Sequence, residues 1–151
     1  MKAFTKLVTF LKLKPATLLL LIEAFFFLGW ARILKKLPFN KIAPSLGEHM
    51  KETSQFLIEG NNKSIKNISN AIHIASKYTF WESQCLVKAI AGMKMLERRG
   101  IDSTLYLGTG RDNDGKMIAH AWLRSGPLYI SGAEGMEQFT IVSMFAKRIR
   151  R

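Results

Sequence analysis

The sequence of 151 residues lacks most of the features that mark common specialised classes of protein. It contains one cysteine, Cys85, so no internal disulfide can form, and the chain suits a reducing compartment such as the cytoplasm. It has no repeat and no low-complexity tract, which argues against a solenoid or a linker. Zinc-finger spacing, a P-loop and an RNA-binding aromatic signature are also missing, so no metal, cofactor or nucleic acid partner is expected. These absences leave a single globular domain with one free thiol.

Acidic residues are scarce, and the imbalance of charge lies mainly at the two ends of the chain. There are 11 acidic residues against 23 lysines and arginines, which gives a formal net charge of +12. Up to residue 41, Glu23 is the only acid, and a second basic cluster runs from Lys147 to Arg151. This charge is compatible with nucleic acid, anionic lipid or an acidic peptide as partner, and selects none of them.

One long apolar run, residues 16–31, lies between Lys14 and Arg32, and Pro15 suits the first turn of a helix. The run is shorter than the roughly 20 residues of a membrane-spanning helix and has Glu23 near its middle, which disfavours a full span. Two alternatives stay open. The helix is buried against the domain, with Glu23 facing solvent or paired with a basic residue, or it lies on a membrane surface with its lysines toward anionic headgroups. The expected location is the cytoplasm, with membrane association left open.

Hydrophobic spacing and turn residues predict helices first and a sheet afterwards. Helices are predicted over residues 1–14, 16–31, 48–60, 64–77 and 79–100, a connector over 34–46, and strands over 103–108, 117–123, 128–130 and 139–145. The pattern predicts an α+β domain in which the helix over 79–100 packs on an antiparallel sheet. Residues 1–47 are expected to form a basic apolar helical region, and 48–151 the core, packed together as one unit.

The helix over 79–100 carries Cys85 near its start. Thr79 and Glu82 have the spacing of a capping box, which predicts that the helix begins near Thr79, and Gly100 suits its end. A cysteine in the first turns lies near the positive end of the helix dipole, which favours the thiolate. A free cysteine on a helix is more often a small buried hydrophobe. However, His120, in the run AHAW on a predicted strand, offers a base for such a nucleophile.

Four motifs in one order resemble the peptidase of lasso-peptide biosynthesis, a family of transglutaminase-like cysteine peptidases that remove the leader from a ribosomally made precursor. They are WESQCL at 81–86, MLERRGI at 95–101, LYLG at 105–108 and AHAW at 119–122. The resemblance implies a papain-like core and no cofactor. It also implies two partners besides the precursor, which are a leader-recognition protein and an ATP-dependent cyclase that forms the macrolactam. No extra domain precedes the helices, so the chain looks like the standalone peptidase.

The same resemblance implies the roles of the candidate catalytic residues. Cys85 would be the nucleophile, and His120 the base that activates it and then protonates the leaving amine. In the family an acid shortly after the histidine orients the imidazole, and the first acid here is Glu134. Strand pairing puts Ser131 or Gly132 near His120, so a backbone carbonyl, Ser131 or no third member at all are the alternatives to Glu134.

Two other functions fit the same sequence. A non-catalytic scaffold could hold the precursor or a membrane for the cyclase, and an acyltransferase could use the same cysteine and histidine. Trp81 and Trp122 are interpreted either as shields of the site from water or as core aromatics.

Overall fold

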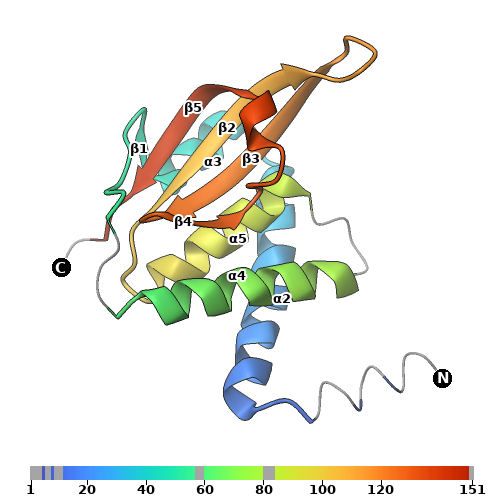
Figure 1. Cartoon of the computed structure of the whole chain (residues 1–151), viewed down its shortest axis with the longest axis vertical. Helices are drawn as coiled ribbons and strands as arrows, with labels where there is room; N and C mark the ends of the chain where they lie inside the picture. The colour runs from blue at the N-terminus through green and yellow to red at the C-terminus, as the bar shows by residue number, and fades with distance from the viewer. Residues whose placement is uncertain (1–4, 6–7, 9–11, 57–59, 80–83, 150–151) are drawn as a thin grey trace.

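A five-stranded antiparallel sheet forms one layer of the structure, and helices cover one of its faces (Figure 1). The computed structural model describes residues 5, 8, 12–56, 60–79 and 84–149. The helices are α2 (Pro15–Lys35), α3 (Phe39–Leu46), α4 (Asn62–Tyr78) and α5 (Cys85–Glu97), with a short 3₁₀ helix, η1 (Met136–Gln138). The strands are β1 (Glu48–His49), β2 (Ser103–Arg111), β3 (Met117–Ser125), β4 (Leu128–Ser131) and β5 (Thr140–Lys147). The predicted α+β class, with the Cys85 helix on an antiparallel sheet, is confirmed.

The strands lie in the order β1-β5-β2-β3-β4, and the long β2–β3 hairpin is the centre of the sheet. In its register Leu105 lies opposite Leu123, and Tyr106 lies opposite Trp122. Because alternate residues of a strand point to opposite faces, the two leucines share one face and the two aromatic residues share the other. His120 lies on the aromatic face, together with Trp122.

The core lies between the leucine face of the sheet and the helices, and α5 is its centre. Eight residues of α5 are buried, on every side of the helix, which is typical of a helix covered all round. At Gly92 the helix comes so near the sheet that an added Cβ would lie 2.9 Å from the Leu123 side chain. α2 and α4 both pack against α5, and α4 also contacts the sheet, where the Ser69 hydroxyl donates to the Ile130 carbonyl of β4 at 2.7 Å.

An ion pair fastens α2 to the end of α5. The Glu23 side chain is 13% exposed, and its carboxylate lies 2.7 Å from Nη2 of Arg99 and 2.9 Å from Nη1 of Arg98. The hydrogen bond from Arg99, with the nearby positive charges, lowers the pKa of Glu23 below its ordinary value. Of the two alternatives for Glu23, facing solvent or pairing with a basic residue, the structure shows the pairing.

The predicted helices over 16–31 and 64–77 and the four predicted strands are present, most of them longer than expected. The connector predicted over 34–46 is wrong, because residues 39–46 form α3. Pro44 removes one backbone donor from this helix, but Ile42 and Leu46, one turn apart, are both buried and hold the segment in helical form. The helix predicted over 1–14 falls largely outside the described residues.

The helix predicted over 48–60 is also wrong. Residues 48–49 form β1, and residues 51–54 run across the aromatic face of the sheet without helical structure. Their backbone groups bond to the sheet instead. The Thr53 amide donates to Oγ1 of Thr104 at 2.9 Å, and the Thr53 carbonyl accepts from Arg124 at 3.1 Å. Contacts distant in sequence therefore override the local helical pattern.

The predicted start of the cysteine helix is wrong as well. α5 begins at Cys85, since Gln84 has extended backbone angles, with φ −74° and ψ 171°. Thr79 lies instead at the end of α4, where its hydroxyl donates to the Ser76 carbonyl. Glu82, the other half of the predicted capping box, lies outside the described residues. The C-terminal end agrees better, because Gly100 has the left-handed φ of 70° soon after the helix.

Candidate active site

Cys85 is the first residue of α5, and its partly buried side chain packs against the edge of the core. The helix closes its first hydrogen bond just there, from the Lys88 amide to the Gln84 carbonyl at 3.0 Å. The amides of a first helical turn have no partner within the helix, so this end of α5 offers backbone donors. Lys35, at the end of α2, donates a hydrogen bond to the Gln84 side chain. The thiol therefore lies at a helix N-terminus, with a cation near the preceding residue.

His120 lies on β3 and is held in one orientation by three neighbours. Its Nε2 lies 2.7 Å from the carbonyl oxygen of Gly132. Its ring stacks on Phe139 and Trp122, with centroids 4.9 and 5.7 Å apart. A carbonyl oxygen can only accept, so Nε2 carries the proton of this hydrogen bond. In the neutral ring Nδ1 is then left as an acceptor, which is the state that a general base needs.

Gly132 comes directly after β4, in a conformation that excludes any side chain. Its φ is +75°, and a Cβ there would lie 2.3 Å from the carbonyl oxygen of Ala121. The sequence predicts Ser131 or Gly132 beside His120, and the carbonyl of Gly132 is that neighbour. The contact with Nε2 of His120 is therefore made by the backbone carbonyl of Gly132 and not by a side chain.

Glu134 is exposed and lies in the turn before η1. Among the interactions of the described residues, no hydrogen bond or ion pair joins Glu134 to His120. The role of Glu134 as the third catalytic residue therefore stays a prediction, and the backbone-carbonyl alternative describes the observed partner of His120.

The elements that carry Cys85 and His120 pack together, but the two side chains border different faces of the sheet. α5 packs on β3 and β4 through the leucine face of the sheet, where Cys85 borders the core. The register places His120 on the aromatic face. No hydrogen bond joins Sγ to the imidazole among the described residues. Pairing with β4 covers β3 only at residues 123–125, so the edge of β3 beside His120 is bordered by Gly132 rather than by a strand.

Trp122 is buried and stacks on Tyr106, with ring centroids 5.6 Å apart. This arrangement favours the core-aromatic interpretation, although Trp122 also forms one wall of the His120 site. Trp81 lies outside the described residues.

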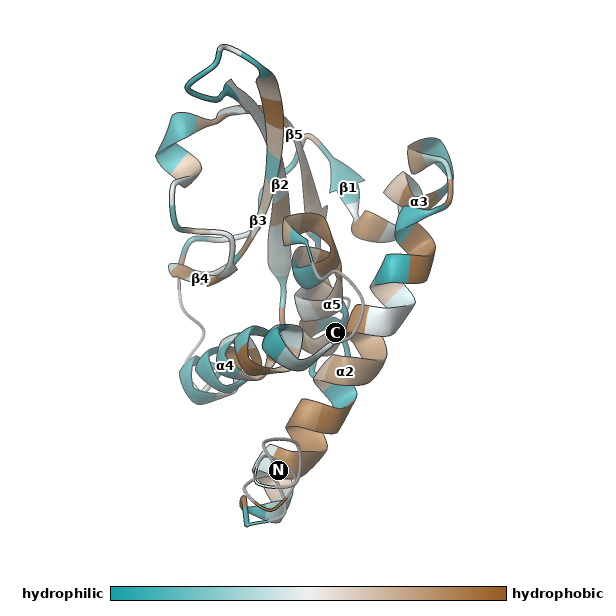
Figure 2. Ribbon diagram, turned by 90° about the vertical axis from the view of Figure 1, so that its right-hand side faces the viewer, coloured by the Kyte–Doolittle hydropathy of each residue, from teal (hydrophilic) through white to brown (hydrophobic). Residues whose placement is uncertain are grey.

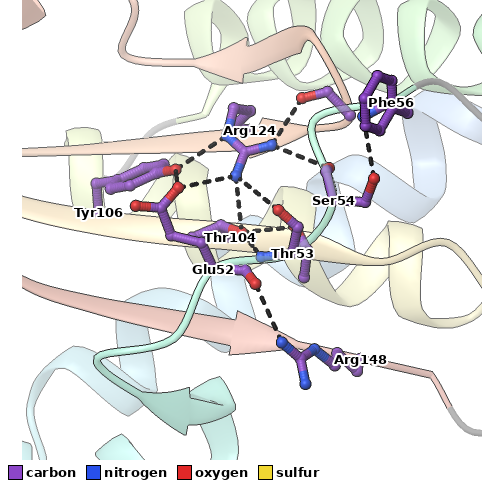
Figure 3. A network of polar contacts seen from close by, with 9 residues as sticks. Glu52, Thr53, Ser54, Phe56, Thr104, Tyr106, Arg124 and Arg148 are labelled. Atoms are coloured by element: carbon purple, nitrogen blue, oxygen red, sulfur yellow. Dashed lines mark hydrogen bonds and ion pairs between the residues drawn. The ribbon is translucent and has the colours of Figure 1, made fainter.

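A buried arginine on the same face escapes sequence reasoning (Figure 3). The side chain of Arg124 is 4% exposed. Its guanidinium donates to Oη of Tyr106 at 2.9 Å and to the carbonyls of Ser54, at 3.1 Å, and Gly126, at 2.8 Å. Each of its nitrogens therefore has at least one acceptor. Arg124 fastens the segment over residues 52–54 to the sheet.

Tyr106 completes this network. Its hydroxyl donates to the Glu52 carboxylate at 3.1 Å while it accepts from Arg124. Burial raises the pKa of Tyr106 above its ordinary value, against the opposing hydrogen bond from Arg124. The polar groups of this network form hydrogen bonds with one another, which indicates a structural role. Within the described part of the chain, no group of three His, Cys, Asp or Glu side chains could hold a metal ion.

The family model of the transglutaminase-like superfamily matches residues 28–144, which is most of the chain. The protein therefore belongs to the transglutaminase-like superfamily, whose members include cysteine peptidases and acyltransferases and whose fold is typically catalytic. The match begins inside α2 and ends within β5, so it includes both Cys85 and His120. No curated protein and no solved structure matches the chain.

Proposed function

We propose that the protein is a cysteine peptidase that removes the leader from a lasso-type precursor, before a separate ATP-dependent cyclase forms the macrolactam. Superfamily membership supports the cysteine chemistry, and the four sequence motifs support the peptidase and its pathway. One observation carries the choice of residues. His120 is oriented by a carbonyl that leaves Nδ1 free, on a strand packed against the helix that begins with the only cysteine.

In the proposed reaction, Cys85 attacks the scissile carbonyl carbon and its proton passes to Nδ1 of His120. Backbone amides at the start of α5 donate to the oxyanion that forms. The C–N bond then breaks, the rest of the precursor leaves as the amine with the proton from His120, and the leader remains attached to sulfur as a thioester. Water attacks the thioester, His120 takes its proton, and the acid product leaves as the thiol is restored.

This mechanism requires Sγ and the imidazole to meet, and beside His120 one edge of β3 is not covered by β4 and is bordered by Gly132. Catalytic hydrogen bonds are often long or misaligned in a protein without substrate and tighten in the complex. We expect the pair to close around this edge when the precursor is bound. The Gly132 carbonyl serves as the orienting group in place of an acid.

The test is mass spectrometry of the precursor incubated with the protein and its leader-recognition partner. The wild type should release a leader-sized fragment, and Cys85→Ala and His120→Ala should lower the rate by at least about a hundredfold. His73→Ala, at an exposed histidine of α4, is the matched control and should cleave normally. Normal cleavage by Cys85→Ala would exclude the proposed nucleophile.

Glu134→Gln tests whether Glu134 is the orienting group. An unchanged rate excludes Glu134 and leaves the Gly132 carbonyl as the observed partner of His120. A loss comparable to that of His120→Ala assigns it to Glu134, which would then have to leave its exposed position to reach the ring.

The scaffold function is the second candidate, and it is favoured because, among the described residues, no hydrogen bond joins Cys85 to His120 and the two border different faces of the sheet. It predicts that the precursor binds and stays intact with wild type and Cys85→Ala alike. An acyltransferase on the same core would be recognised in the same spectra, because it joins the acyl group to an amine and gives a new amide instead of two free ends.

A further inference from the structure

The outward face of α2 is apolar along most of its length, although no other element of the described part of the chain covers it. The inward residues of this helix, among them Leu21 and Leu28, are buried in the core. The outward residues repeat at helical spacing and are between 56% and 71% exposed: Leu19, Ile22, Phe26 and Ile33. We call these four residues the α2 stripe. Figure 2 shows that α2 is hydrophobic along nearly its whole length, and that its N-terminal turns extend beyond α4.

A surface helix of a soluble domain has a polar outward face, so the α2 stripe needs an explanation. The only acid of the helix, Glu23, does not contribute to this face, because its carboxylate is turned to Arg98 and Arg99. Near the C-terminal half of the helix the surface is also hollowed. This depression is lined by Phe25, Phe26, Trp30, Ile33, Arg32 and Lys36.

Cations surround the α2 stripe at both ends. Over residues 12–41 of the sequence, Glu23 is the only acid, against six basic residues: Lys12, Lys14, Arg32, Lys35, Lys36 and Lys41. Lys14 and Lys36 cap the two ends of α2, and both are exposed. The α2 stripe is apolar and its two ends are cationic. An anionic lipid leaflet has the complementary chemistry, because its acyl chains are apolar and its headgroups are negatively charged.

We propose that the α2 stripe docks the protein on the surface of an anionic lipid bilayer. The stripe enters the boundary between headgroups and acyl chains, and the flanking lysines contact the headgroups. The inference rests on the structure of α2 and does not depend on the peptidase activity.

The helix lies on the bilayer rather than crossing it. By length and composition α2 could span a membrane. However, Leu21, Ala24 and Leu28 belong to the domain core, and the ion pair of Glu23 ties the helix to α5. A full span would remove all of these groups from the domain and would place Glu23 in hydrocarbon. Because Lys35 bonds to the Gln84 side chain, the docked surface ends beside the start of the Cys85 helix.

Co-sedimentation of the full chain with lipid vesicles tests the proposal. We expect binding to vesicles that contain phosphatidylglycerol, and at least about tenfold weaker binding to pure phosphatidylcholine or at high salt. The double variant Ile22→Ser/Phe26→Ser should lower the affinity at least about tenfold, because it removes apolar side chains from the contact. Lys14→Glu/Lys36→Glu should do the same by reversing the flanking charges.

Matched control variants distinguish docking through the α2 stripe from nonspecific binding to the vesicles. Phe56→Ser removes an 84% exposed aromatic residue outside the α2 stripe, and Lys63→Glu/Lys66→Glu makes the same charge change on α4. Both should bind like wild type, and circular dichroism should show that all variants are folded.

Three results would overturn the proposal. These are equal binding by the stripe variants and wild type, no binding of wild type to anionic vesicles, and a wild-type dimer in analytical ultracentrifugation that the stripe variants abolish. The last result would assign the α2 stripe to a second copy of the chain.

Discussion

At the scale of single residues, Arg124 is the side chain whose loss should disturb the aromatic face most. Arg124→Met keeps the apolar stem but leaves buried acceptors, including the Thr53 carbonyl, without donors. An unsatisfied buried polar group costs about 1–3 kcal/mol, so we expect the free energy of unfolding in urea to fall by about 3 kcal/mol. Arg111→Met removes an exposed arginine from the β2–β3 hairpin and should change it by less than about 0.5 kcal/mol. Equal effects of the two variants would show that the network is not stabilising.

Glu23 gives a residue-scale prediction that depends on pH. Its folded pKa is lowered from the ordinary value of 4.5, mainly by the Arg99 hydrogen bond, so the pair stabilises the fold above that value. The stabilisation is lost as the pH falls below 4.5 and through the lowered pKa, where the folded carboxylate takes up a proton. Glu23→Gln should therefore destabilise the protein by about 1–2 kcal/mol at pH 7, and the difference from wild type should shrink at pH 3. Urea unfolding at both pH values measures this, with Glu137→Gln as the exposed control. A difference independent of pH would contradict it.

Contacts between residues that are close in the sequence could be predicted from it, whereas contacts between residues far apart in the sequence could not. His120 and Gly132 are only 12 positions apart and lie on either side of a short turn, so the sequence could place one of Ser131 and Gly132 near the imidazole, although the β3–β4 pairing itself ends at Leu123 and Ser131. Arg124 bonds to Thr53 and Ser54, about 70 positions earlier, in a segment whose local pattern looks helical. The sequence does not mark Arg124 as buried, because an arginine exposed to solvent on a strand would fit the same sequence pattern. The position of Cys85 relative to His120 is likewise a long-range property.

At the scale of elements, the sequence predicts the long helices and the strands well but not the boundaries set by tertiary contacts. α2 and α4 follow from apolar spacing, and the hairpin follows from alternation around the loop at 112–116. α3 forms despite Pro44, because burial of Ile42 and Leu46 outweighs one lost hydrogen bond. α5 starts at Cys85 rather than Thr79, because α4 runs on to Tyr78 and the Thr79 hydroxyl bonds back to it. Only the assembled structure decides such boundaries.

The end of β4 provides a prediction at the same scale, with a matched control in the chain. Gly132 and Gly135 have nearly the same φ, +75° and +77°, but only Gly132 has backbone atoms where a Cβ would lie. Gly135→Ala should cost about 1 kcal/mol from the left-handed conformation alone. Gly132→Ala adds the collision with the Ala121 carbonyl, so we expect a loss of about 3 kcal/mol or more in urea unfolding. Equal losses would mean that the turn after β4 moves freely, and His120 would then not be held by it.

At the scale of the whole molecule, the fold is organised around a single core in which α2 takes part. Leu28 is fully buried, and it belongs to one cluster with residues of α5 and of the sheet. Ile33, on the same helix, is 66% exposed. If α2 were an appended anchor, its inner face could be trimmed without affecting the rest of the domain. The structure leads to the opposite expectation, because the helices and the sheet bury their apolar faces against each other.

Leu28→Ala tests whether α2 and the sheet unfold together. The cavity should lower the free energy of unfolding by about 2–5 kcal/mol, and far-ultraviolet circular dichroism and tryptophan fluorescence should still show one shared transition. Ile33→Ala, on the outward face, should leave stability within about 0.5 kcal/mol of wild type. Hydrogen exchange of the β2 and β3 amides should accelerate in Leu28→Ala by the factor that the lost stability predicts. Unchanged exchange in the sheet would show that α2 opens independently, and the helix would then be an attachment to the domain rather than part of its core.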